Sequence, residues 1–110
     1  MKISVDQPKG NVRRIVLDGR MDLSGVQTAE SEFNTAVAGS QNIIVDLGKV
    51  SFIASLGIRL LVAAAQTRTK LGGKMVLMNP DEMTKKILKT TGIDQLMPIC
   101  NGLDEALASV

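Results

Sequence analysis

The sequence predicts an α/β fold: a mixed, mostly parallel sheet of four to five strands with about four helices on its faces. Two observations lead to this prediction. The chain begins with two strand-like patterns and then alternates helical and strand-like ones, the order of a hairpin followed by β-α-β units. The segment NIIVDL at 42–47 is almost continuously apolar, as is typical of a central strand covered on both faces. A chain of 110 residues suits one core, so we expect a single domain over residues 1–110.

The first forty residues predict a hairpin and a helix. Residues 2–5 form a short candidate strand that ends at the turn-like segment QPKGN, and residues 12–18 form a stronger one rich in β-branched side chains. A helix beginning at Ser24 or Gly25 and running to residue 37 follows, because its apolar residues recur at helical spacing. Those residues are Val26, Ala29, Phe33 and Val37, and Gly39 comes next as a typical helix-ending glycine.

The rest of the chain predicts three more helices alternating with two strands. A helix over 55–70 ends at Gly72-Gly73, and KMVLM at 74–78 forms the next strand. Pro80-Asp81-Glu82 begins a third helix, because proline and acidic residues suit a first helical turn. A short strand over 97–100 and a helix from Gly102 complete the order.

Composition argues against an enzyme and against nucleic acid as the main partner. The chain has no histidine, which excludes Ser-His-Asp and Cys-His nucleophiles and imidazole metal sites. A single cysteine, Cys100, cannot form an internal disulfide, and we interpret it as a small buried hydrophobic residue. Thirteen basic residues against eleven acidic ones leave a net charge of +2, and only two aromatic residues are present for base stacking. We therefore expect no catalytic centre, metal or cofactor.

Two further features concern location and charge. No apolar run resembles a signal peptide, and the longest apolar stretch, 60–65, is too short to cross a bilayer. We therefore expect a cytoplasmic protein that has no contact with a membrane. Lys85, Lys86 and Lys89 gather late in the third predicted helix, where the helix dipole favours cations, and we interpret them as a solvated helix end.

The second predicted helix is where the sequence points to function. At about 100° per residue its small apolar residues share one face, suited to close packing on the sheet. The opposite face holds Ser55, Leu56, Arg59, Ala63, Gln66 and Lys70, of which Ser55, Leu56 and Arg59 form one surface patch. Ser55 is then either the N-cap of this helix, which the residues alone favour, or a phosphorylation site. A phosphoryl group there would add about 1.5 to 2 negative charges to a helix N-terminus without unfolding it.

Two carboxylates stand at strand ends. Asp22, in GRMD after the second predicted strand, suits either a turn or cap before the first helix or a functional role. Asp46, in IIVDL, suits a residue that caps neighbouring backbone amides. Neither has a base, a nucleophile or a ligand set near it in the sequence, and no phosphate-binding glycine motif is present.

Together these segments resemble the STAS-domain family, in particular the bacterial anti-sigma factor antagonists. The resemblance covers nearly the whole chain. It is carried by GRMD at 19–22, IIVDLGKVSFIASLGIRLLVAAAQ at 43–66, GGKMVLMNP at 72–80 and ILKTTGIDQLMPI at 87–99. The second of these is similar to the family's apolar strand followed by a helix start of the type D-S-x-G-L.

The resemblance assigns roles to individual residues. In the family, the serine of D-S-x-G is phosphorylated by a partner anti-sigma kinase, and by position that residue is Ser55, with Gly57 as the glycine. Ala54 replaces the family's aspartate, and Leu56 stands where a small residue or threonine is common. Asp22 matches the family's aspartate near the phosphorylation site, which implies that it helps to shape the kinase-binding surface. The resemblance therefore favours Ser55 as a regulatory phosphoacceptor.

The function implied is partner switching. The unphosphorylated protein would bind an anti-sigma factor with serine kinase activity and so release a sigma factor, and phosphorylation of Ser55 would end that binding. A serine phosphatase of the PP2C type would reverse the modification, and nucleotide and Mg²⁺ would belong to the partners. The expected contact residues are Asp22, Phe52, Ala54, Ser55, Leu56, Gly57, Arg59 and Ala63.

Two other functions are alternatives. A STAS domain without phosphorylation would act as a scaffold, or as an accessory subunit of a lipid-transport ATPase complex, and Ala54 and Leu56 favour this alternative. An enzyme using Cys100 or a carboxylate would need catalytic partners that the sequence does not supply.

Overall fold

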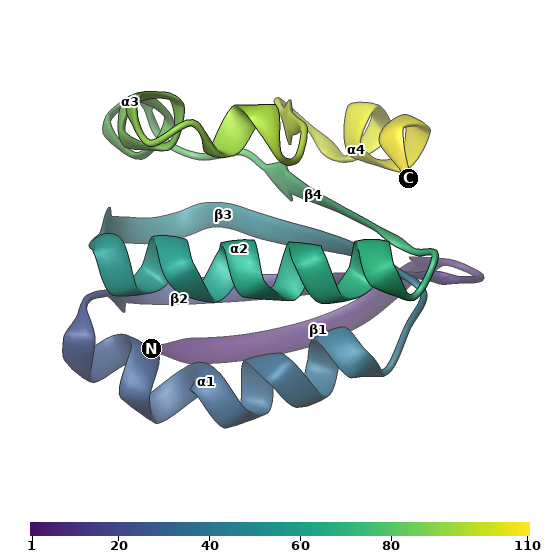
Figure 1. Ribbon diagram of the computed structural model, residues 1–110, viewed down its shortest axis with the longest axis horizontal. Coiled ribbons are helices and arrows are strands. Elements are labelled where there is room, and N and C mark those ends of the chain that lie inside the picture. The colour runs from purple at the N-terminus through teal and green to yellow at the C-terminus, as the bar shows by residue number, and fades with distance from the viewer.

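The computed structural model describes residues 1–110 and contains one five-stranded sheet in the order β1-β2-β3-β4-β5 (Figure 1). Strand β1 runs antiparallel to β2, and the other neighbouring strands are parallel. The predicted α/β class with a mixed, mostly parallel sheet and four α-helices is confirmed. The elements are β1 Lys2–Lys9, β2 Val12–Met21, α1 Leu23–Ala38, β3 Asn42–Ile53, α2 Ser55–Lys70, β4 Lys74–Met78, α3 Glu82–Thr90, the 3₁₀-helix η1 Ile93–Gln95, β5 Ile99–Cys100 and α4 Leu103–Ser109.

Three strands are longer than predicted. Strand β1 continues through Pro8 to Lys9, where the sequence suggested a turn. An edge strand tolerates this proline, because its missing N–H can lie on the unpaired side, and the β1–β2 register shifts at this point. Strand β3 runs to Ile53, past the predicted end at residue 47. Its pairing with β2 has two irregularities, one between Asp46 and Lys49 and the other between Val50 and Phe52.

The main core lies between the sheet and the helices α1, α2 and α3. Alternating residues of the inner strands point into it, among them Ile15 on β2 and Val45 on β3, and the helices add Phe33, Leu61 and Leu88. All five side chains are fully buried. Burying a large apolar side chain contributes about 1.5–3 kcal/mol, so this layer holds the helices against the sheet.

A smaller core lies on the opposite face under α4. It contains Val12, Ile44, Val76, Met78, Cys100 and Ala106. Cys100 is buried, as predicted. Towards β1 this face is polar. Arg14 is on β2, the strand between β1 and β3, and its Nε donates to Asp6 Oδ1 on β1 at 2.9 Å. An antiparallel edge can face water in this way.

The parallel strands bring three helix starts to one edge of the sheet. Strands β2, β3 and β4 end at Met21, Ile53 and Met78, and α1, α2 and α3 begin within a few residues of those ends. The carboxyl ends of parallel strands meet at the same edge, which is where α/β proteins usually place their sites. The chain has no helix of the length and hydropathy needed to cross a membrane.

Candidate partner-binding site

Two glycines allow the beginnings of α1 and α2 to lie against the end of β2. A Cβ atom on Gly57 would lie 3.0 Å from Met21 Cβ and 3.1 Å from the Met21 carbonyl oxygen. A Cβ on Gly25 would lie 1.9 Å from the Arg20 carbonyl oxygen, which is impossibly close. The Ala54 amide also donates to the Met21 carbonyl at 3.0 Å. Gly57 is buried, so it positions Ser55 and does not itself present a contact surface.

Ser55 is the first residue of α2 and is exposed. The N-cap position belongs to Ala54, whose φ of −103° and ψ of 174° are extended, and no side chain caps this helix. The interpretation of Ser55 as the N-cap is therefore wrong, because Ser55 lies one residue too late. The first amides of α2 consequently have no side-chain acceptor, and Ser55 contributes the first of them.

Asp22 is the N-cap of α1. Its Oδ1 accepts a hydrogen bond from the Gly25 amide at 2.9 Å, and its Oδ2 accepts one from Arg20 Nε at 3.2 Å. The pKa of the Asp22 carboxyl lies below its ordinary value. The main cause is the hydrogen bond from the Gly25 amide, and the second cause is the hydrogen bond from Arg20. The capping role suggested by the sequence is confirmed, and α1 begins at Leu23 as a result. Asp22 is only partly buried, so the capping carboxylate also forms part of the surface beside Ser55.

Arg20 is a member of this site that the sequence analysis missed. Its Cζ lies 4.5 Å from the centre of the Phe52 ring, a cation–π contact. The two residues are opposite one another in the β2–β3 pairing. Two irregularities in that pairing set this register, and residue spacing alone does not predict where they fall, so the contact was not predicted from the sequence.

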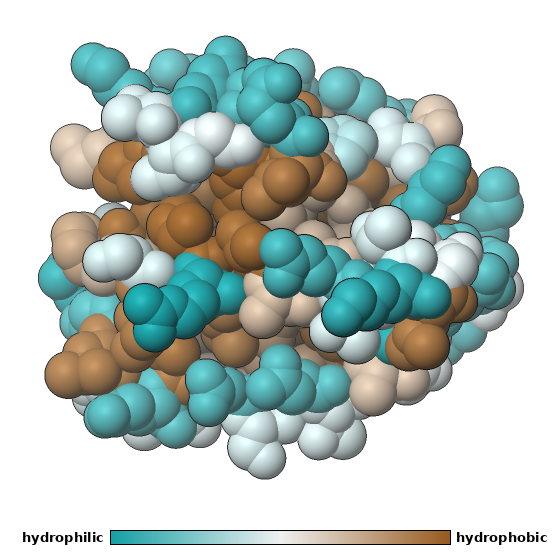
Figure 2. Space-filling model, viewed as in Figure 1, coloured by the Kyte–Doolittle hydropathy of each residue, from teal (hydrophilic) through white to brown (hydrophobic).

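The surface along α2 agrees with the predicted faces except at Leu56, which was predicted on the exposed face. Arg59 and Ala63 are exposed one and two turns after Ser55, and Leu56 is half-buried against the main core. Leu23, at the start of α1, is 60% exposed and adds an apolar side chain next to Asp22 that the sequence analysis did not single out. Figure 2 shows further hydrophobic side chains gathered between α2 and α3.

The expected contact residues therefore divide into two groups. Asp22, Phe52, Ala54, Ser55, Leu56 and Gly57 lie where β2 and β3 end, and Arg59 and Ala63 lie farther along α2. No cluster of three or more metal-ligating side chains is found in the structure. Asp46 accepts from the Gly48 amide at 2.9 Å, which confirms its predicted role as a backbone cap.

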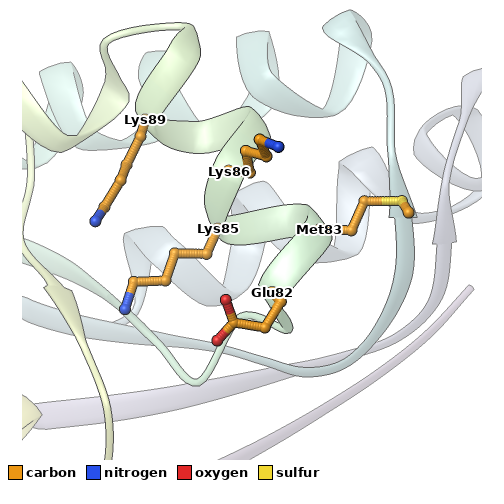
Figure 3. A pocket seen from close by; sticks show the side chains of 5 residues that line it. All are labelled: Glu82, Met83, Lys85, Lys86 and Lys89. Carbon is orange, nitrogen blue, oxygen red and sulfur yellow. The ribbon is translucent and has the colours of Figure 1, made fainter.

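The lysines of α3 do not converge on one point. A shallow hollow beside this helix is lined by Glu82, Met83, Lys85, Lys86 and Lys89. Figure 3 shows Lys85 and Lys89 extending to one side of α3, and Lys86 and Met83 extending to the other. No ion pair joins any of them, and Met83 is 71% exposed. This arrangement agrees with the interpretation of these lysines as a solvated part of the helix.

Comparison with known proteins gives the family. The sequence profile of the STAS domain matches residues 3–106. The chain belongs to the STAS domain family. Among curated relatives, this STAS domain is similar to BtrV of Bordetella bronchiseptica, with 24% identity over 99% of this chain and 94% of BtrV. BtrV carries the provisional name of an anti-sigma factor antagonist.

Solved structures share the fold of this STAS domain. An anti-sigma factor antagonist from Mycobacterium paratuberculosis superposes with a TM-score of 0.89 at 24% identity, covering 99% of this chain and 92% of that one. Phosphorylated SpoIIAA, a Bacillus cell fate determinant, superposes with a TM-score of 0.73 at 21% identity, covering 97% of each chain. The TM-scores show that these proteins share a fold with this chain.

Proposed function

We propose that this STAS domain is an anti-sigma factor antagonist that works by partner switching. Without phosphate it binds an anti-sigma factor that has serine kinase activity, and a sigma factor is released. Phosphorylation of Ser55 ends this binding, and a PP2C-type phosphatase restores it. The observation that carries the proposal is the position of Ser55: exposed, at the first residue of α2, beside helix amides that no side chain caps.

The comparisons support this proposal in two ways. The relative BtrV is named as an antagonist of this kind. SpoIIAA, which shares the fold, has been solved in both an unphosphorylated and a phosphorylated form. The fold therefore accommodates such a modification in at least one protein, and Ser55 is the residue of this chain that fits the family's acceptor.

The local chemistry suits a phosphoacceptor. The Ser55 hydroxyl takes part in no hydrogen bond that modification would break, and its side chain is open to a kinase. A phosphoserine adds about 1.5 to 2 negative charges and three acceptor oxygens. The free amides and the positive end of the α2 dipole stabilise those charges, so α2 remains folded.

The same charge opposes partner binding. The surface beside Ser55 contains the apolar side chains of Leu23 and Leu56 together with the Asp22 carboxylate. A partner that covers this surface must remove water from it, and desolvating a phosphate dianion beside the Asp22 carboxylate is costly. Phosphorylation can therefore release the partner with no change in the fold of the antagonist.

The proposal is tested by mixing the protein with the anti-sigma kinase encoded nearest to its gene and Mg-ATP. Mass spectrometry should then find one phosphate, at Ser55, and Ser55→Ala should abolish it. Ser24→Ala and Ser51→Ala are matched controls, because both serines are exposed near the same edge and should not matter.

Stable binding without phosphate would contradict the switch. It would favour the scaffold or the accessory subunit of a lipid-transport ATPase complex, with Ala54 and Leu56 as the residues that depart from the family pattern. A phosphate at Ser24 or Ser51 would contradict the assignment of Ser55.

A further inference from the structure

Arg20 is held by two weak contacts beside Ser55. Its Nε donates to Asp22 Oδ2 at 3.2 Å, longer than the 2.7–2.9 Å typical of a charge-assisted bond. Its guanidinium lies over the Phe52 ring at 4.5 Å. The side chain is still 60% exposed, so water competes for every group it touches. Such an arrangement is easily exchanged for a better one.

Backbone pairing places Ser55 just past the end of the strand that pairs with the strand of Arg20. Arg20 is paired with Phe52, Met21 is paired with Ile53, and the Ala54 amide then donates to the Met21 carbonyl at 3.0 Å. Ser55 directly follows Ala54 in the chain. Asp22, which Arg20 already reaches, is likewise the next residue after Met21. The Asp22 and Ser55 side chains therefore emerge from two adjacent strand ends.

A phosphoryl group on Ser55 would compete with Asp22 for Arg20. It carries more charge than a carboxylate and offers three oxygens to a guanidinium, which binds phosphate in a bidentate manner. Asp22 would not be left without a partner, because its other oxygen keeps the Gly25 amide at 2.9 Å. The α1 cap therefore survives the exchange.

We propose that Arg20 is a positioning residue that moves from Asp22 and Phe52 to the phosphoryl group of Ser55. The inference rests on the proposed phosphorylation of Ser55. Before modification, Arg20 neutralises Asp22 and covers Phe52, which fixes two of the expected partner contacts. After modification, Asp22 and Phe52 both lose their contact with the Arg20 guanidinium. One added phosphoryl group therefore changes the partner surface at Ser55, Asp22 and Phe52.

The test uses protein with phosphoserine installed at position 55 during synthesis, so that no kinase is needed. The charged residues that strand pairing and helix spacing place around position 55 are Arg20 from β2, Asp22 from the β2–α1 junction and Arg59, one turn along α2. A ³¹P NMR titration at low salt gives the pKa of the phosphoserine. Arg20→Gln should raise this pKa by roughly half to one pH unit, about three- to tenfold in proton affinity, because a paired cation favours the dianion.

Two further measurements complete the test. In the wild-type chain the Arg20 Nε–H resonance should shift on phosphorylation. Arg20→Lys should keep only part of the lowering of the phosphoserine pKa, because lysine cannot donate the two parallel hydrogen bonds of a guanidinium. Arg59→Gln is the matched control, one turn away on α2. A phosphoserine pKa unchanged by Arg20→Gln, or changed more by Arg59→Gln, would overturn the inference. Neither result would bear on whether a kinase modifies Ser55, which the mass spectrometry decides separately.

Discussion

At the scale of single residues, the site depends on its small residues, two glycines and an alanine, as much as on its polar ones. Gly25 and Gly57 have no Cβ, which lets two helix starts touch the end of β2. Ala54 has no polar group, which leaves the first amides of α2 without an acceptor. Both features make Ser55 an exposed hydroxyl on a closely fixed backbone.

Gly25→Ala should destabilise the protein. The new methyl group would lie 1.9 Å from the Arg20 carbonyl oxygen, a backbone atom that cannot move without disturbing β2. We expect a loss of about 1–3 kcal/mol in the free energy of unfolding, measured by urea denaturation. Gly10→Ala is the control, because nothing lies within 4 Å of its added Cβ and Gly10 is not one of the glycines with a positive φ. Equal losses for the two variants would contradict the role given to Gly25.

The Asp22 charge should make stability depend on pH. Its pKa is lowered in the folded protein, so the charge stabilises the fold above the unfolded value of about 3.9. That contribution is lost as the pH falls through the folded pKa. Asp22→Asn keeps a capping oxygen and removes the charge. Its unfolding midpoint should lie below that of the wild type at pH 7, and the difference should shrink as the pH falls below about 4. A difference that stays constant from pH 7 to the acid limit of folding would contradict this account.

At the scale of elements, α2 begins without a cap while α1 and α3 have aspartate caps. Asp22 accepts from Gly25 at 2.9 Å, and Asp81 accepts from Thr84 at 2.7 Å. Three helices begin at the same edge of the sheet, and the one with the candidate phosphorylation site is the one left unsatisfied. A phosphoserine at the first position would supply the missing acceptor.

Ala54→Ser should therefore stabilise the unphosphorylated protein. A hydroxyl at the N-cap can accept from the second or third amide of α2, and such caps contribute about 0.5–2 kcal/mol. Thermal and urea unfolding would measure the gain. Ala63→Ser, at an exposed position in the middle of the same helix, should give no gain, since serine is a poorer helix former there than alanine. An equal gain at both positions would show that capping is not the cause.

At the scale of the whole molecule, the sequence contained enough to predict the class of fold and the face of α2 that is exposed. The near-continuous run at 42–47 and the alternation of patterns were sufficient, because both follow from local periodicity. Contacts between residues far apart in the sequence could not be predicted from this periodicity. Arg68 is 6% exposed and donates to the Ser40 carbonyl at the end of α1, a contact that depends on how the helices pack. The Arg20–Phe52 contact depends on strand register in the same way.

Partner binding should respond to charge at position 55 while the fold does not. We expect Ser55→Asp to weaken binding to the anti-sigma kinase by at least about tenfold, a change of roughly 1.4 kcal/mol, and Ser55→Ala to bind like the wild type. Isothermal titration calorimetry measures both affinities. Circular dichroism should show unchanged folding for each variant. Binding of Ser55→Asp as tight as that of the wild type would rule out the switch.

The two irregularities in the pairing of β2 with β3 affect which mutations this protein can accept. Leu47, Val50 and Ile53 all point into the main core at intervals of three residues, where a regular strand would repeat every two. Changes of residue type at the exposed positions between them should be tolerated. Adding or deleting one residue there would turn Phe52 into the core and Ile53 out to solvent. We expect natural relatives of this chain to keep a constant length across this stretch and to vary it at the Gly10-Asn11 turn.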